Sequence, residues 1–274
     1  MILWSSLPRT VLLAGVALLI TGGAQAGVVV TLGAPRAEFA NFTGPNGVCA
    51  THTQCVYGTE TFAGWTGGGF TSAFVDGQHN FPAGTAISGT YAGAITHDTD
   101  NTYGGAYGTQ PYPAADGTGH YTLSLAAEGV RGANYFGVWI TAMDPYNVLT
   151  LSSAGATVFS LGSADLRKAI AATTNPGAYY GDPDNGGDTA EPFAYVNIYD
   201  TSGFFDRVTF GNNGPSNFES SNDSVGYFAS PNVSGVPVAI ATNTVSVPEP
   251  ESLTMVLPAL ALMMAWRARR RRSI

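Results

Sequence analysis

The chain has 274 residues, of which 11% are charged, 11% are aromatic and 35 are glycine. Soluble proteins average about 25% charged residues, so this composition excludes a coiled coil, a long helical bundle and an acidic disordered chain. Residues 27–248 hold five basic and seventeen acidic side chains, a net charge of −12 within a formal total of −8. Because such an acidic body repels phosphates, we expect no nucleic-acid partner.

The N-terminal segment 1–26 has the three parts of a secretory signal peptide in order. Arg9 supplies the positive charge, residues 11–20 form the apolar stretch, and Ala24 and Ala26 form an Ala-x-Ala site before Gly27. The apolar stretch is about half as long as the ~20 residues of a membrane-spanning helix. We therefore expect export by the Sec machinery and cleavage before Gly27, with an uncleaved membrane anchor as the alternative.

Cys49 and Cys55 are the only cysteines of the chain. In an exported protein an even pair favours a disulfide. In the chain-entropy model, closing so short a loop stabilises the fold by roughly 2–2.5 kcal/mol. The alternative is a metal site of Cys49, His52 and Cys55, but no fourth ligand is near and oxidised cysteines offer no thiolate. The sequence therefore predicts the disulfide.

Between residues 56 and 229 the sequence predicts many short strands, separated by turn pairs such as Asp116–Gly117. One helix is expected over Ser163–Ala172, with Ser163 as its N-cap and Pro176 beyond its end. No clear internal repeat is present, which argues against a propeller or β-helix. We therefore expect an all-β domain over residues 27–246, an antiparallel β-sandwich of jelly-roll type with one short helix. The expected strands are Val56–Phe62, Gly69–Val75, Ile87–Ile95, His120–Ala126, Tyr135–Ala142, Asn147–Ser152, Thr157–Leu161, Phe193–Tyr199, Asp206–Phe210 and Ser224–Ala229.

The richest cluster of oxygen ligands is Asp182, Asp184 and Asp188, on a Gly-rich segment that suits Ca²⁺. The EF-hand pattern fails there, because Gly186 occupies the fifth position and no Glu occupies the twelfth. Glu219 is a further candidate ligand. The sequence favours a solvated surface turn, with a structural calcium ion as the alternative and as the only cofactor considered.

No catalytic motif stands out in this sequence. Neither a Gly-x-Ser-x-Gly elbow nor a His-Glu-x-x-His motif occurs. Glycosidases need two carboxylates across a cleft, but seventeen acidic residues supply such pairs by chance. We expect no enzymatic activity and no catalytic residues.

Several tyrosines of Gly- and Pro-rich segments are candidates for ligand binding. Exposed aromatic rings can stack on sugar rings, so Tyr103, Tyr107 and Tyr112 are a candidate glycan platform. The favoured alternative is that these rings pack over one end of the sandwich.

The C-terminal segment 247–274 combines a short motif, an apolar run and an arginine cluster. Fourteen residues make about 21 Å of helix, short of the ~30 Å hydrocarbon core, so the expected membrane helix is a short one. Arginines stay on the cytoplasmic side, so residues 27–250 face outward. The motif is Pro248, Glu249 and Pro250, the apolar run extends from Leu253 to Trp266, and the basic residues are Arg267, Arg269, Arg270, Arg271 and Arg272.

This C-terminal arrangement resembles the PEP-CTERM sorting signal of bacterial exosortase substrates. The resemblance implies that an exosortase, a membrane protease, acts near Pro248–Pro250. It also implies that the chain stays only transiently in the inner membrane of a Gram-negative-type bacterium. The cell surface or the extracellular matrix would then be its destination.

The body resembles a group of exosortase-dependent surface proteins over about residues 120–228. The resemblance rests on the segment 134–151, a Tyr-Phe-Gly strand followed by a Tyr-Asn strand, and on Tyr195-Val-Asn197, Phe205-Asp-Arg-Val208 and the segment 218–225. Ser221 and Asp223 depart from the pattern of the group, which has Asp and His there. The group has no settled activity, so the resemblance bears on location and fold more than on function.

These observations predict an exported, exosortase-processed protein of the cell surface or matrix, with a non-enzymatic structural or interaction role. The alternative is a glycan-binding β-sandwich module whose partner is extracellular polysaccharide. A secreted hydrolase is the third possibility. It would need a cleft with convergent carboxylates or a Ser-His pair.

Overall fold

The computed structural model describes residues 27–42, 49, 54–99, 103, 105–106, 111–229 and 236–237. Among these residues, no helix has both the length and the apolar character needed to cross a membrane. Several predicted sites lie outside the described residues. They are Ala24, Ala26, Tyr107, Pro248, Glu249, Pro250 and the whole tail from Leu253 to Arg272.

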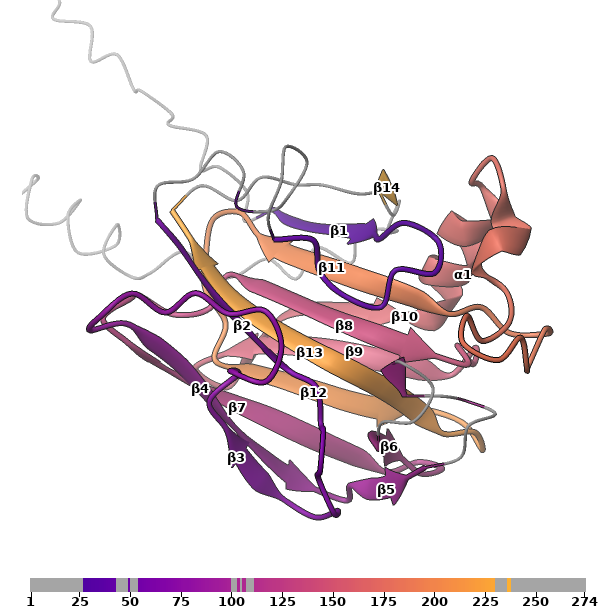
Figure 1. Cartoon of the computed structure of the whole chain (residues 1–274), viewed down its shortest axis with the longest axis horizontal. Helices are drawn as coiled ribbons and strands as arrows, with labels where there is room; N and C mark the ends of the chain where they lie inside the picture. The colour runs from indigo at the N-terminus through magenta and orange to yellow at the C-terminus, as the bar shows by residue number, and fades with distance from the viewer. Residues whose placement is uncertain are drawn as a thin grey trace, which may run out of the picture.

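Two antiparallel β-sheets form the body of the chain, and the strand axes of the two sheets are roughly aligned across the view (Figure 1). The eight-stranded sheet has the order β14 (Val236–Pro237), β1 (Val28–Leu32), β11 (Ala194–Asp200), β8 (Tyr135–Thr141), β13 (Phe218–Phe228), β6 (Tyr112–Ala115) and β5 (Thr96–Asp98), with β2 (Cys55–Glu60) also paired to β13. The six-stranded sheet has the order β10 (Ala156–Gly162), β9 (Asn147–Ser153), β12 (Arg207–Asn212), β7 (His120–Glu128), β4 (Ala86–Gly93) and β3 (Phe70–Ser72). The prediction of a mostly β, sandwich-like fold with two antiparallel sheets is confirmed.

The helix α1 (Ser163–Ala171) lies where the sequence predicts it, and the 3₁₀ helix η2 (Pro176–Tyr179) follows. The prediction that Ser163 caps the helix is wrong. Gly162 is the N-cap and no side chain caps the helix. The Ser163 hydroxyl instead donates to the Asp144 carbonyl, in the loop between β8 and β9. A tertiary hydrogen bond thus takes the place of the local one.

The main core lies between the two sheets. Successive residues of a strand point to opposite faces, and on β8 the side chains of Phe136, Val138 and Ile140 enter this core. From the six-stranded sheet, Phe210 packs against the edge of Phe136 with ring centroids 5.9 Å apart, and it stacks on Tyr121 at 4.4 Å. Aromatic packing therefore joins the sheets near their centres.

A second core covers the opposite face of the eight-stranded sheet. Tyr135 and Trp139 of β8 lie in it, together with Tyr195 of β11. The loop after β1, which crosses this face in Figure 1, brings Phe42 to within 5.5 Å of the Tyr135 ring. Every residue of β8 and β11 is consequently buried, whereas a sandwich sheet with one solvated face would alternate.

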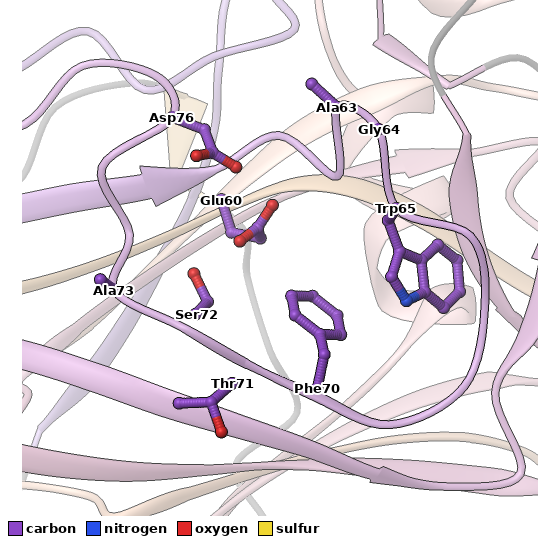
Figure 2. A pocket seen from close by; sticks show the side chains of 9 residues that line it. All are labelled: Glu60, Ala63, Gly64, Trp65, Phe70, Thr71, Ser72, Ala73 and Asp76. Carbon is purple, nitrogen blue, oxygen red and sulfur yellow. The ribbon is translucent and has the colours of Figure 1, made fainter.

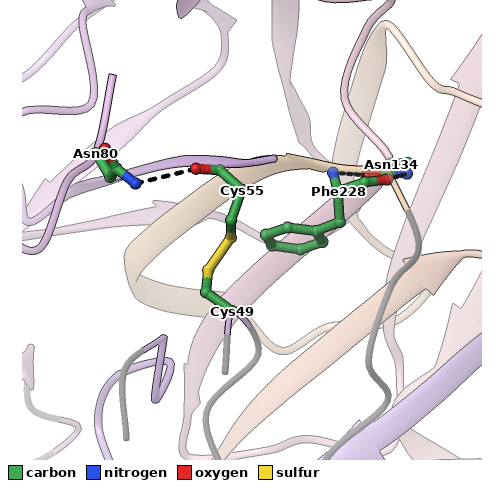
Figure 3. The surroundings of a disulfide bond; sticks show 5 residues. All are labelled: Cys49, Cys55, Asn80, Asn134 and Phe228. Carbon is green, nitrogen blue, oxygen red and sulfur yellow. Dashed lines mark hydrogen bonds between the residues drawn. A yellow bond between two sulfur atoms is a disulfide. The ribbon is translucent and has the colours of Figure 1, made fainter. Parts of the chain in front are cut away.

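The predicted disulfide between Cys49 and Cys55 is confirmed (Figure 3). It fastens the covering loop to the first residue of β2 and packs in the second core beside Phe228. Two hydrogen bonds between Asn134 and the Phe228 backbone, of 2.7 and 2.8 Å, hold that strand end. The Asn80 amide donates to the Cys55 carbonyl at 3.0 Å. The disulfide therefore links the covering loop to an already fixed part of the sheet.

Candidate functional site

A surface pocket of about 280 Å³ opens beside the loop that connects β2 to β3 (Figure 2). Its walls combine two carboxylates, two aromatic rings and small polar side chains. Its lining residues are Glu60, Ala63, Gly64, Trp65, Phe70, Thr71, Ser72, Ala73 and Asp76. We call this site the 60–76 pocket.

The end of β2 and the segment after β3 bring the two carboxylates together. Glu60 is the last residue of β2 and pairs with Asp223 of β13. Thr59 forms an isolated parallel bridge with Val75, and its carbonyl accepts from the Asp76 nitrogen at 3.2 Å. The backbone after β3 therefore lies alongside β2, and Figure 2 shows the Asp76 and Glu60 side chains next to each other.

Two buried phenylalanines beside this pocket have backbones in the left-handed region. Phe62 has φ of 61° and Phe74 has φ of 53°, which is uncommon for bulky residues. The Phe62 nitrogen donates to Glu60 Oε1 at 2.7 Å, and the Phe74 nitrogen donates to Ser72 Oγ at 2.9 Å. Backbone strain of about 1–3 kcal/mol per residue persists where the surroundings impose it, and it concentrates at functional sites. In these strained conformations the two backbone nitrogens hold the side chains of Glu60 and Ser72, which line the pocket.

Glu60 is 6% exposed, whereas Asp76 lies at the surface. Burial is the main cause that raises the pKa of Glu60 to about 7, and a hydrogen bond with the Asp76 side chain raises it further. Hydrogen bonds from Ser72 and the Phe62 nitrogen act in the opposite direction. Two carboxyl groups can form a hydrogen bond only if one of them holds a proton. Burial therefore keeps the Glu60 carboxyl partly protonated near neutral pH.

A third acidic side chain, that of Asp223, lies next to Glu60 on the adjacent strand β13. Asp223 is 0% exposed, and its Oδ2 accepts from the Tyr91 hydroxyl at 2.8 Å. Its Oδ1 is buried without a hydrogen-bond partner. Burial holds the pKa of Asp223 well above its usual range, and the charge of Glu60 acts in the same direction. A buried, protonated acidic group therefore adjoins Glu60 on the neighbouring strand.

Trp65 and Phe70 form the aromatic wall opposite the carboxylates (Figure 2). Phe70 stacks on the buried Tyr91 with ring centroids 4.7 Å apart. The Trp65 indole donates to the Gly68 carbonyl at 3.1 Å, and His97 Nε2 donates to the Trp65 carbonyl at 3.0 Å. Both rings are half-buried and held from behind. Aromatic faces opposite fixed acceptors suit a ligand with apolar faces and hydroxyl edges.

Of the predicted calcium residues, Asp182 forms its hydrogen bonds inside the 182–188 loop. Asp182 is 2% exposed, and its carboxylate accepts from the Asp184 nitrogen at 2.8 Å and from the Asn185 amide at 3.0 Å. Burial is the main cause that raises the pKa of Asp184, and the positive charge of Arg36 opposes it. These contacts describe a closed turn in which Asp182 is buried, whereas the sequence favours a solvated one.

Glu219 lies in a different acidic group, with Asp144 and Glu191. Burial is the main cause that raises the pKa of Glu219 to about 8, followed by the charge of Asp144 and, more weakly, that of Glu191. Burial also raises the pKa of Glu191 to about 7, together with Asp144 and Asp188, whose side chains form hydrogen bonds with it. Glu191 thus interacts both with Glu219 and with Asp188 of the 182–188 loop. Over the described residues, no three or more His, Cys, Asp and Glu side chains are arranged to hold a metal ion.

Of the predicted stacking tyrosines, Tyr103 is 39% exposed and Tyr107 lies outside the described residues. The prediction that Tyr112 presents its ring on a loop is wrong. Tyr112 is 0% exposed, because β6 pairs with β5 and places Tyr112 opposite Asp98. The aromatic residues of the pocket, Trp65 and Phe70, were not predicted.

Comparison of the sequence with protein-family models and with curated proteins found no match. The interpretation of the 60–76 pocket therefore rests on its own chemistry.

Proposed function

We propose that this chain is an exported surface or matrix protein with a non-enzymatic interaction role, and that its 60–76 pocket binds a saccharide. The observation that carries the proposal is a pocket with a carboxylate pair on one wall and the Trp65 and Phe70 rings on the other. Hydroxyl groups of a sugar would donate to the carboxylates, and its apolar face would stack on the rings.

The two ends of the chain support the location. The signal-like segment 1–26 and the PEP-CTERM-like tail 247–274 favour export, exosortase processing and release at the surface or into the matrix. A disulfide persists in oxidising compartments, and Cys49–Cys55 agrees with such a destination. We also propose the jelly-roll topology, the signal helix and the membrane helix that the sequence predicts. Extracellular polysaccharide would then be the natural partner.

The arrangement of Glu60 and Asp76 favours binding over hydrolysis. Glycosidases hold their two carboxyl groups about 5 Å or more apart, on either side of the scissile bond. Glu60 and Asp76 are instead hydrogen-bonded to each other. This pair leaves no room for a sugar bond between its members, so we propose no catalytic step.

A Trp65→Ala variant tests the saccharide site. We expect roughly tenfold weaker binding to any glycan that the full chain captures on an array, because losing the stacking contact costs about 1–1.5 kcal/mol. The measurement is titration calorimetry in detergent, with a thermal melt to verify folding. Tyr103→Ala is the control, since Tyr103 is an exposed aromatic residue that does not line the pocket.

Three outcomes would contradict the proposal. An array without any captured glycan removes saccharide binding altogether. Weaker binding of Tyr103→Ala, with Trp65→Ala unchanged, moves the site to the loop of Tyr103. Equal affinity of all three proteins shows that neither ring contacts the sugar.

The location is tested by intact mass and fractionation in the native host, with and without exosortase activity. We expect a mature species that begins near Gly27 and ends near Pro250 and is released from the membrane only when the exosortase is active. A species that keeps Arg267–Arg272 in the membrane under both conditions would show that the tail is a simple anchor.

A further inference from the structure

We infer that the ligand of the 60–76 pocket carries a positive charge, in the form of a protonated amine on the sugar. An amino sugar without its N-acetyl group is the ligand class that fits. The inference rests on the proposed function and adds to it the chemical class of the saccharide.

The first argument is the sign of the charge around the pocket. Glu60 and Asp76 are the only charged residues among its lining side chains. No Lys or Arg occurs between residues 54 and 99, the part of the chain that builds the pocket, nor in β13. The nearby histidines are His97, which is engaged with the Trp65 carbonyl, and His79 on an exposed loop. An anionic sugar would meet only like charge.

The second argument is that the hydrogen-bond partners of Glu60 include no cation. Glu60 is 6% exposed and has only Ser72, the Phe62 nitrogen and the Asp76 carboxyl as hydrogen-bond partners. Buried carboxylates are normally paired with a cation or keep a proton. An ammonium group offers three donors, enough to contact Glu60 and Asp76 and to replace the proton that Glu60 holds. A neutral hydroxyl can donate to one carboxylate but supplies no positive charge to stabilise ionised Glu60.

The third argument is the aromatic wall. A cation near the face of an aromatic ring is attracted by the ring quadrupole, most strongly for Trp. Trp65 and Phe70 line the same 280 Å³ pocket as the carboxylates. A ligand held by the carboxylates would therefore have aromatic rings as its next neighbours. Charge and ring geometry favour the same ligand class.

Binding of the amine should release a proton. In the free pocket the buried Glu60 carboxyl is partly protonated near neutral pH, because burial raises its pKa to about 7. When the ammonium group takes the place of that proton, Glu60 becomes ionised and the proton passes to the buffer. No covalent bond is formed or broken.

The test uses three oligosaccharides of equal length, titrated into the full chain in detergent. They are a glucosamine oligomer, the matching N-acetylglucosamine oligomer and a galacturonic acid oligomer. We expect the glucosamine oligomer to bind at least tenfold more tightly than the N-acetylated one, and the uronic acid oligomer not to bind. Calorimetry near neutral pH in two buffers of different ionisation enthalpy should show net proton release for the glucosamine oligomer alone.

Glu60→Gln and Asp76→Asn are the variants that localise the effect. Each should abolish the preference for the amine, and Asp76→Asn serves if Glu60→Gln does not fold, because Asp76 is at the surface. The control is Glu128→Gln, at the exposed end of β7, which should keep the preference.

The possible failures are distinguishable. Equal affinity for the glucosamine and N-acetylglucosamine oligomers overturns the inference but leaves saccharide binding standing. A preference that survives in Asp76→Asn shows that the amine binds elsewhere. If none of these oligomers binds and the glycan array is also empty, the proposed function fails with the inference.

Discussion

Glu219→Gln should stabilise the protein at pH 8 by on the order of 3 kcal/mol and leave its stability at pH 4 nearly unchanged. Glu219 is 5% exposed on β13, and its Oε2 is buried without a hydrogen-bond partner. Burial, the charge of Asp144 and, more weakly, that of Glu191 raise the pKa of Glu219 to about 8. Glutamine reproduces the shape of the carboxyl group and stays neutral at pH 8, where the carboxyl ionises.

The sign follows from proton linkage. Because the pKa of Glu219 is higher in the folded state than in the unfolded chain, the folded state holds more protons between about pH 4.5 and pH 8. Stability therefore falls as the pH rises through this window, and the stabilisation is complete only below it. Glu60, with a pKa raised to about 7, contributes in the same direction. The unmodified protein should consequently be less stable at pH 8 than at pH 5.

The measurement is denaturant unfolding at pH 4, 5, 7 and 8 for the full chain and the variant. Glu128→Gln makes the same chemical change on an exposed part of β7, so its pH profile should match that of the unmodified chain. If Glu219→Gln lowers stability at pH 8 and calcium raises that of the unmodified chain, Glu219 is an ionised ligand. The prediction that Glu219 is a calcium ligand would then replace the interpretation that Glu219 is buried in its protonated form.

Period-two alternation was sufficient to find most of this fold. Each of the ten predicted strands overlaps an observed one, and α1 begins at the expected residue. The strands that were missed lack the alternation. β6 has the sequence Tyr-Pro-Ala-Ala and is buried at all four positions, and proline within a strand argues against that assignment. β1 is a run of apolar residues directly after the expected cleavage site. For such runs the sequence alone does not show which side of the strand faces the core or which strand pairs with it.

The candidate site was harder to predict because its residues become neighbours only through the fold. Glu60 and Asp76 meet because two backbone segments run alongside each other, and no spacing rule links them. Glu219 and Glu191 similarly come from different strands and loops. Trp65 and Phe70 did have a local signal, since they flank the glycine run of residues 67–69. Aromatic residues beside a glycine run should therefore be treated as candidates for ligand binding, as Tyr103 and Tyr112 were.

Trp139→Ala should destabilise the protein by about 3–5 kcal/mol, as much as Phe136→Ala, because both faces of β8 are buried. Trp139 is 1% exposed in the second core, where its ring lies 6.2 Å from that of Phe193. Phe136 is 0% exposed in the main core. On a sandwich with a solvated outer face, the change at residue 139 would resemble a surface substitution of within ~0.5 kcal/mol.

The comparison requires denaturant unfolding of both variants, with Tyr146→Ala, 46% exposed, as the control of small effect. Reduction of Cys49–Cys55 should cost less in Trp139→Ala than in the unmodified chain, because residues of one cluster couple. A near-neutral Trp139→Ala, or full additivity with reduction, would mean that the loop after β1 does not cover the sheet. A large and coupled effect makes that loop part of the folded unit. The disulfide then stabilises a third layer over the sheet rather than only closing a short loop.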